Sequence, residues 1–121
     1  MQDSSKKPNF KGLWCSPEVG TSLFDFFIEK SESFDSGAVI EGYITDRFGH
    51  AAFSGYVDKY KIQFTKRYSE EARRGPVAAQ GEIHYEGCLV FGKFEGTYKV
   101  MKGEDRITNS GTFVMQEVMP E

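Results

Sequence analysis

Histidine, serine and acidic side chains could carry out chemistry in this sequence, but they are sparse and scattered. His50 and His84 are far apart in the chain, and His84 shares its predicted strand face with Glu82 and Glu86. A metal site needs several ligands together, and a catalytic nucleophile needs an adjacent base. No such spacing and no phosphate-binding glycine motif occurs. We therefore expect no metal and no cofactor, favour a protein without catalysis, and place His84 on a solvated face.

Cysteines and a group of basic residues are the remaining reactive or charged features. Cys15 and Cys88 are too few for a disulfide framework, so we expect free thiols in a reducing compartment. With no apolar leader at the N-terminus, the expected location is cytoplasmic. Basic residues concentrate in mid-chain, at Lys59, Lys61, Lys66, Arg67, Arg73 and Arg74. Because Glu70 and Glu71 adjoin them, we expect a mixed surface rather than a phosphate-binding patch.

Length and composition limit the fold and the partners. The chain has 121 residues and a formal net charge of −3, which does not favour nucleic acid as a partner. No run approaches the ~20 apolar residues of a membrane span, so no membrane partner is expected. Eleven Phe, six Tyr and one Trp provide enough aromatic area for one compact core.

The elements that must position these residues are short strands. From Ala38 to Tyr68, three runs (39–45, 51–57 and 60–68) are separated by turn signals at 46–49 and 58–59, and the last run alternates with a period of two. Further strands are expected at 10–15, 23–29, 77–85, 88–101 and 111–117, with turns or loops at 16–20, 31–37, 69–76, 86–87 and 102–110. Residues 1–9 are expected to form a disordered tail, and residues 10–118 the folded domain.

Glycines inside several runs favour a closed sheet. They are Gly42, Gly55, Gly81, Gly92 and Gly96. Glycine within a strand usually marks a bulge or a sharp bend, and strongly coiled strands allow a sheet to close and remove its edges. The sequence therefore predicts an all-β fold, a single antiparallel eight-stranded up-and-down (meander) barrel.

Gly12-Leu13-Trp14, at the head of this meander, resembles the G-x-W signature of the calycin superfamily, which includes lipocalins, fatty-acid-binding proteins and avidins. The resemblance implies a calycin-like barrel in which Trp14 closes one end. We expect Trp14 to be buried there as part of the core.

The stretch from Gly42 to Thr45 resembles the Gly-Thr-Tyr-Ile-Thr stretch of avidins, with one residue missing. The resemblance implies that Tyr43, Thr45 and Ser16 fall at positions that contact the polar head of a ligand. This sequence departs from avidins in having a single Trp, with Lys66 where a ligand-stacking Trp would stand. Biotin is therefore not expected.

The register of residues 39–45 leaves two interpretations open. If Ile40 and Ile44 point inward, the barrel has an ordinary core and Tyr43 is a surface aromatic. If Tyr43 and Thr45 point inward, the barrel holds a polar ligand. A shift of one residue separates the two interpretations, and we favour the ordinary core.

The function expected from these features is binding. The first hypothesis is a small, partly apolar ligand held inside the barrel. Its candidate binding residues are Trp14, Ser16, Phe24, Phe26, Tyr43, Thr45 and Phe64. The alternative is a protein-interaction or self-association module with a solidly packed barrel. Because Leu23 and Phe27 give the second strand a further apolar face, we expect a homodimer or other homo-oligomer.

Overall fold

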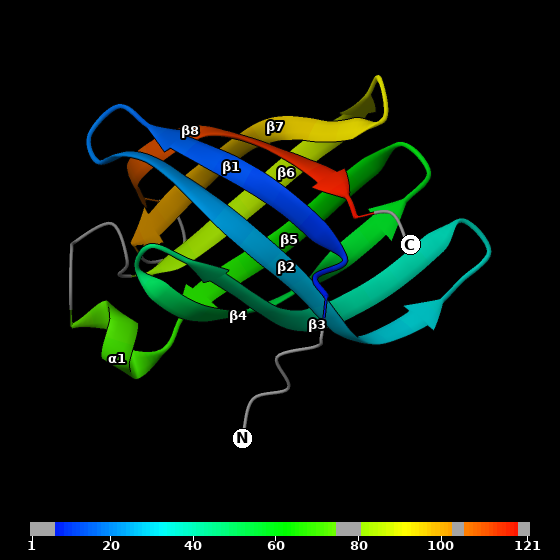
Figure 1. Cartoon of the computed structure of the whole chain (residues 1–121), viewed down its shortest axis with the longest axis horizontal. Coiled ribbons are helices and arrows are strands. Elements are labelled where there is room, and N and C mark those ends of the chain that lie inside the picture. The colour runs from blue at the N-terminus through cyan, green and yellow to red at the C-terminus, as the bar shows by residue number, and fades with distance from the viewer. Residues whose placement is uncertain (1–6, 75–80, 103–105, 119–121) are drawn as a thin grey trace.

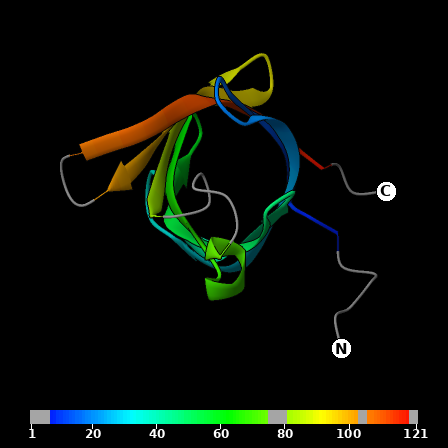
Figure 2. The ribbon, with the colours of Figure 1, turned by 90° about the vertical axis from the view of Figure 1, so that its left-hand side faces the viewer.

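The strands follow one another around a closed ring. A computed structural model describes residues 7–74, 81–102 and 106–118. The strands are β1 (Phe10–Ser16), β2 (Gly20–Ser33), β3 (Gly37–Asp46), β4 (Gly49–Asp58), β5 (Lys61–Tyr68), β6 (Glu82–Val90), β7 (Lys93–Lys102) and β8 (Arg106–Glu117), with a short helix α1 (Glu70–Arg73) after β5. Every strand pairs antiparallel with its sequence neighbours, and β1 also pairs with β8 (Figures 1 and 2). The predicted eight-stranded up-and-down barrel is confirmed.

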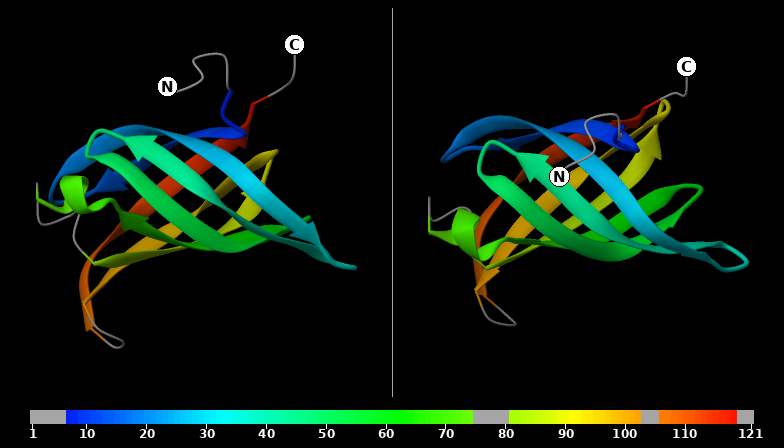
Figure 3. Two further views of the ribbon diagram at one scale, coloured as in Figure 1. Left: turned by 90° about the horizontal axis from the view of Figure 1, so that it is seen from below. Right: turned by 60° about the horizontal axis from the view of Figure 1, so that its bottom comes forward.

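The barrel has two ends of different character. Helix α1 and the β1–β2 and β3–β4 turns lie at one end, which we call the α1 end. The β2–β3, β4–β5 and β6–β7 hairpins lie at the opposite end, which we call the tip end (Figures 1 and 3).

The turn between β6 and β7 is not where the sequence predicted it. Glu86 and Gly87 lie inside β6, and the chain reverses at Phe91 and Gly92. Both residues have positive φ, 49° and 81°, as a two-residue type I′ turn requires. Gly87 is needed instead for packing, because a Cβ there would lie 2.8 Å from the Phe113 ring. The prediction at 86–87 was wrong because both roles select glycine.

Other predicted boundaries shift at the ends of strands. The predicted loop 31–37 is shorter, since β2 extends to Ser33, and the predicted loop 102–110 gives way to β8 from Arg106. In the predicted loop 69–76, Ser69 caps α1 by accepting a hydrogen bond from the Ala72 amide. Residues 75–80, which include part of that loop and the start of the predicted strand 77–85, lie outside the described residues.

Only the end of the predicted tail belongs to the described part of the chain, because residues 1–6 lie outside it. The Asn9 amide donates to the Phe26 carbonyl at 2.8 Å, and the Val118 amide donates to the Asn9 carbonyl at 2.9 Å. Asn9 therefore extends the pairing of β1 by one residue, to β2 on one side and to Val118, which follows β8, on the other.

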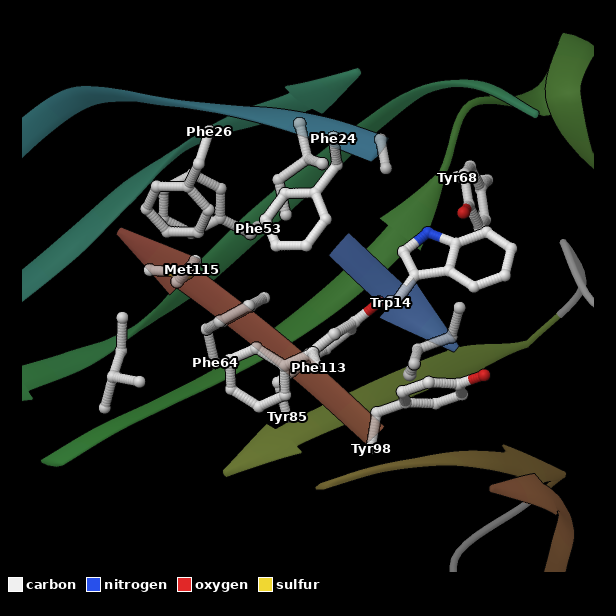
Figure 4. Packing of buried hydrophobic residues seen from close by; sticks show 14 of the residues in the cluster. Trp14, Phe24, Phe26, Phe53, Phe64, Tyr68, Tyr85, Tyr98, Phe113 and Met115 are labelled. Atoms are coloured by element: carbon white, nitrogen blue, oxygen red, sulfur yellow. The ribbon is translucent and has the colours of Figure 1, made fainter. Parts of the chain in front are cut away.

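Aromatic rings fill the interior. Trp14 is buried, as predicted, and rings from opposite walls meet at the barrel centre (Figure 4). Phe26 stacks on Phe53 with ring centroids 4.1 Å apart, and Phe64 stacks on Tyr85 at 4.5 Å. An eight-stranded barrel is just wide enough for its side chains to fill. The favoured register of β3 is confirmed, since Ile40 and Ile44 are both buried in this core.

Gly42 shows how the strands bend. A Cβ at this position would lie 1.9 Å from the Phe27 carbonyl oxygen of β2, so only glycine fits. The register of β2 against β3 shifts between Ile28 and Lys30, beside this glycine. The expected link between glycine inside a strand and a bulge therefore holds here.

Candidate functional site

A buried polar cluster lies inside the barrel at the α1 end. Asp46 Oδ2 accepts hydrogen bonds from Trp14 Nε1 at 3.1 Å, from Lys66 Nζ at 3.2 Å and from the Tyr68 hydroxyl. Lys66 Nζ also donates to the Tyr68 hydroxyl at 2.9 Å. The side chains of Lys66 and Asp46 are only 1% and 0% exposed. We call Trp14, Asp46, Lys66 and Tyr68 the polar cluster.

Lys66 is surrounded by aromatic rings as well as by its ion pair. Its ammonium lies 4.5 Å from the ring centre of Tyr68, 5.1 Å from that of Tyr85 and 5.9 Å from that of Trp14. Burial lowers the pKa of Lys66 from 10.5 to about 8, although the Asp46 carboxylate opposes this change. The ring faces and the carboxylate together replace the hydration that the Lys66 ammonium loses on burial.

The tyrosines around the cluster stay protonated over a wide pH range. Burial raises the pKa of Tyr68, and the charge of Asp46 raises it further. Burial raises the pKa of Tyr85 well above its ordinary value, and raises that of Tyr98. These hydroxyls can donate hydrogen bonds but cannot serve as bases near neutral pH.

The space left beside the polar cluster is small. A cavity of about 10 Å³ remains at this end, lined by Trp14, Val19, Phe48, Lys66, Tyr68, Ile83, Tyr85, Tyr98, Val100 and Asn109. Such a volume holds about one water molecule. Phe48 lines this cavity, with its ring 5.5 Å from that of Trp14.

The structure divides the predicted binding residues into two groups. Trp14, Phe24, Phe26 and Phe64 point into the barrel, where they belong to one packed core (Figure 4). Phe26 and Phe64 are direct neighbours, with ring centroids 5.2 Å apart. These side chains pack against each other and so fill the space that a ligand inside the barrel would need.

Of the other predicted binding residues, Tyr43 and Thr45 lie outside this core, whereas Ser16 is buried at the α1 end on the same face of β1 as Trp14. Tyr43 and Thr45 are on the outer face of β3, where Tyr43 stacks on Phe27 at 4.6 Å. Ser16 accepts hydrogen bonds from the amides of Glu18 and Val19 and thereby shapes the β1–β2 turn. These three residues do not meet at one site.

Sequence reasoning missed the two charged members of the cluster. The prediction that Lys66 belongs to a solvated surface is wrong, whereas Lys59, Lys61, Arg67, Arg73 and Arg74 are exposed as expected. The alternation of β5 could have indicated that Lys66 is buried, because Lys66 shares a face of the strand with Ile62 and Phe64. From the sequence, Asp46 was predicted only to begin the turn at 46–49.

The outer wall carries larger concave surfaces than the interior. A shallow groove of about 560 Å³ crosses β4 to β8 and is lined largely by polar side chains such as Gln63, Thr65, His84, Glu86 and Lys99. A second groove, of about 330 Å³, lies over the β7–β8–β1 wall and includes Leu13, Cys15, Thr112 and Val114.

Among the described residues, no group of three or more His, Cys, Asp or Glu side chains gathers to bind a metal ion. His84 is exposed and approaches Glu82 at 3.4 Å, which fits the expected solvated face. Cys15 and Cys88 are free thiols. No helix in the described part is long and apolar enough to cross a membrane.

Comparisons with protein-family models, with curated proteins and with solved structures give no match for this chain. What this chain can bind must therefore follow from the geometry of the barrel, its polar cluster and its surfaces.

Proposed function

We propose that this protein is a non-catalytic interaction module that binds with the outside of a filled barrel. The observation that supports this proposal is the packing of the interior, where stacked rings fill the barrel and the cavity beside the polar cluster measures only about 10 Å³. Pockets for small organic ligands usually measure ~300–1,000 Å³. A ligand inside the barrel would have to displace core rings, whereas the outer wall offers open surface.

The β2–β1–β8 wall is suited to contact with a second copy of the chain. Leu23 is 76% exposed, and its strand neighbour Leu13 pairs in turn with Val114. Leu13 and Val114 border the groove of about 330 Å³. A protruding leucine beside a groove is self-complementary under a two-fold axis, because each copy can insert Leu23 into the groove of the other.

Light scattering across protein concentrations up to about 100 µM tests this contact. We expect a concentration-dependent dimer that Leu23→Gln weakens, since the variant keeps the size of the side chain and removes its apolar character. Val39→Gln is the matched control, because Val39 is an exposed apolar residue on β3 and should leave the dimer intact. A monomer at all concentrations, or equal weakening by both variants, would contradict the proposal.

A small ligand at the α1 end is the second candidate. The polar cluster favours it, because its polar groups could orient a ligand once the cavity of about 10 Å³ is enlarged, and Gly12-Leu13-Trp14 at the head of the barrel resembles the calycin signature. Trp14 lies in the cavity wall, so its fluorescence should change on addition of a ligand that moves Phe48 aside. An unchanged spectrum across a panel of small amphipathic compounds would argue for the filled module.

A further inference from the structure

Exposed apolar residues gather on two neighbouring hairpins at the tip end. Leu89, Val90 and Phe91 form the β6–β7 turn region, and Phe91 is 100% exposed. Tyr60, on the β4–β5 hairpin, is 69% exposed. The Leu89 amide donates to the Tyr60 carbonyl at 2.6 Å, which joins the two hairpins. We call these four residues the apolar tip.

The backbone at Phe91 does not suit a phenylalanine. Its φ of 49° lies in the left-handed region, which side chains other than glycine, asparagine and aspartate rarely adopt. Asn-Gly is the sequence such a turn prefers. Since Phe91 buries nothing within the chain, its presence is not explained by packing or by turn geometry. Strained, exposed residues of this kind are found where function requires them.

Lysines surround the apolar tip although the whole chain carries a net charge of −3. Lys59 and Lys61 flank Tyr60, and Lys93 follows Gly92; all three are exposed. Asp58 Oδ1 accepts hydrogen bonds from the amides of Tyr60 and Lys61, so this carboxylate lies beside two of the lysines and offsets only part of their positive charge. The tip thus combines apolar side chains at its end with positive charge around them.

We infer that the apolar tip docks peripherally on an anionic lipid surface. Exposed aromatic and aliphatic side chains enter the region between headgroups and acyl chains, while lysines attract the anionic headgroups. Lysine stems lie along the apolar zone and keep the ammonium groups in water. A peripheral contact of this kind needs no membrane-spanning segment.

A second copy of the chain is a poorer occupant of this tip. Under a two-fold axis, Lys59, Lys61 and Lys93 would face the same three lysines of the other copy, and like charges oppose association. A flat protein interface also requires ~800 Å² from each partner, which two narrow hairpins do not readily provide. A soft bilayer can accept a narrow protruding tip.

Cosedimentation of the full chain with lipid vesicles tests the inference. The probes are vesicles of phosphatidylcholine alone and vesicles that also contain about 30 mol % phosphatidylserine. We expect binding to the anionic vesicles only, weakened by added salt. Replacing Lys59, Lys61 or Lys93 by Gln should weaken binding about five-fold for each lysine.

Phe91→Asn is the decisive variant, because it removes the aromatic ring and gives the turn its preferred sequence. It should fold at least as well as the wild type and bind anionic vesicles at least about ten-fold more weakly. Ile107→Asn is the control, since it removes an exposed apolar residue from β8 and should bind normally. No binding to anionic vesicles, unchanged binding of Phe91→Asn, or loss of self-association in that variant would overturn the inference. Because the dimer test uses Leu23, its failure would be distinct from failure here.

Discussion

Asp46 accepts hydrogen bonds with both carboxylate oxygens, and each oxygen serves a different part of the fold. Oδ1 accepts from the Phe48 amide at 2.9 Å and shapes the β3–β4 turn, while Oδ2 receives the donors of the polar cluster. Within the described part of the chain, no buried side-chain nitrogen or oxygen lacks a hydrogen-bond partner. The cluster is tolerated because its polar atoms are paired, as buried charges require.

Removing one member of the buried pair should destabilise the fold. Lys66→Ala leaves the Asp46 carboxylate without its cation, and we expect a loss of about 3–5 kcal/mol in the free energy of unfolding. Urea denaturation measures the loss, with Lys61→Ala on the exposed face of β5 as the control, expected within about 0.5 kcal/mol of the wild type. The vacated space is lined by aromatic rings and a carboxylate, so added propylammonium should restore part of the stability. Equal stability of both variants would show that Lys66 is not buried.

The polar cluster also predicts how stability depends on pH. Burial lowers the pKa of Lys66 to about 8 from its ordinary 10.5. Between these values the unfolded chain binds a proton that the folded protein has released, so the free energy of unfolding should rise with pH, by an amount on the order of 2 kcal/mol up to pH ~10. Above that, stability should fall, because burial raises the pKa of Tyr68 and Tyr85, and only the unfolded chain ionises them.

Urea titrations from about pH 7 to 11 measure this profile. The matched variant is Lys66→Met combined with Asp46→Asn, which removes both charges and keeps similar volumes. It should lose the rise and keep the fall at high pH. A rise of the same size in this variant would assign the pH dependence to other groups.

At the scale of the element, the β6–β7 turn needs positive φ at two residues, which suits Gly92 but is unfavourable for Phe91. Phe91→Asn should raise the free energy of unfolding by about 0.5–1 kcal/mol, because asparagine tolerates the left-handed conformation. Leu89→Asn is the matched control, since it removes a neighbouring exposed apolar side chain from a residue without positive φ, and no gain is expected. Thermal unfolding of the two variants decides the matter. A loss of stability in Phe91→Asn would mean that Phe91 makes intramolecular contacts.

The elements were largely predictable from sequence, but their inner and outer faces were less so. Period-two alternation revealed the strands, and the apolar pattern of β3 correctly put Ile40 and Ile44 inside. Alternation also placed Lys66 with Ile62 and Phe64, yet the side-chain charge argued for solvent. Its burial depends on Asp46, which is 20 residues away and on a different strand. Such partners become visible only when the strands are assembled.

At the scale of the whole molecule, closure separates the inside from the outside. The pairing of β1 with β8 removes the edges that an open sheet would expose. Closure also fixes the interior volume, which aromatic side chains fill. Length and glycine spacing pointed to a closed barrel, but the filling could not be predicted, because it depends on how rings from different strands interlock.

Closure predicts uniform protection of the backbone amides in β1. Successive amides of a strand point to opposite sides, so if β1 were an edge strand, every second amide would face water and exchange quickly with D₂O. In the closed barrel, residues 10–15 pair with β2 on one side and β8 on the other. Hydrogen exchange followed by NMR should therefore find both Leu13 and Trp14 protected, with the turn residue Phe91 as a rapidly exchanging reference. Alternating protection would show an open seam, and a second copy could then associate by adding a strand at β1. Uniform protection would leave the side chains of Leu13, Leu23 and Val114 as the contact on this wall.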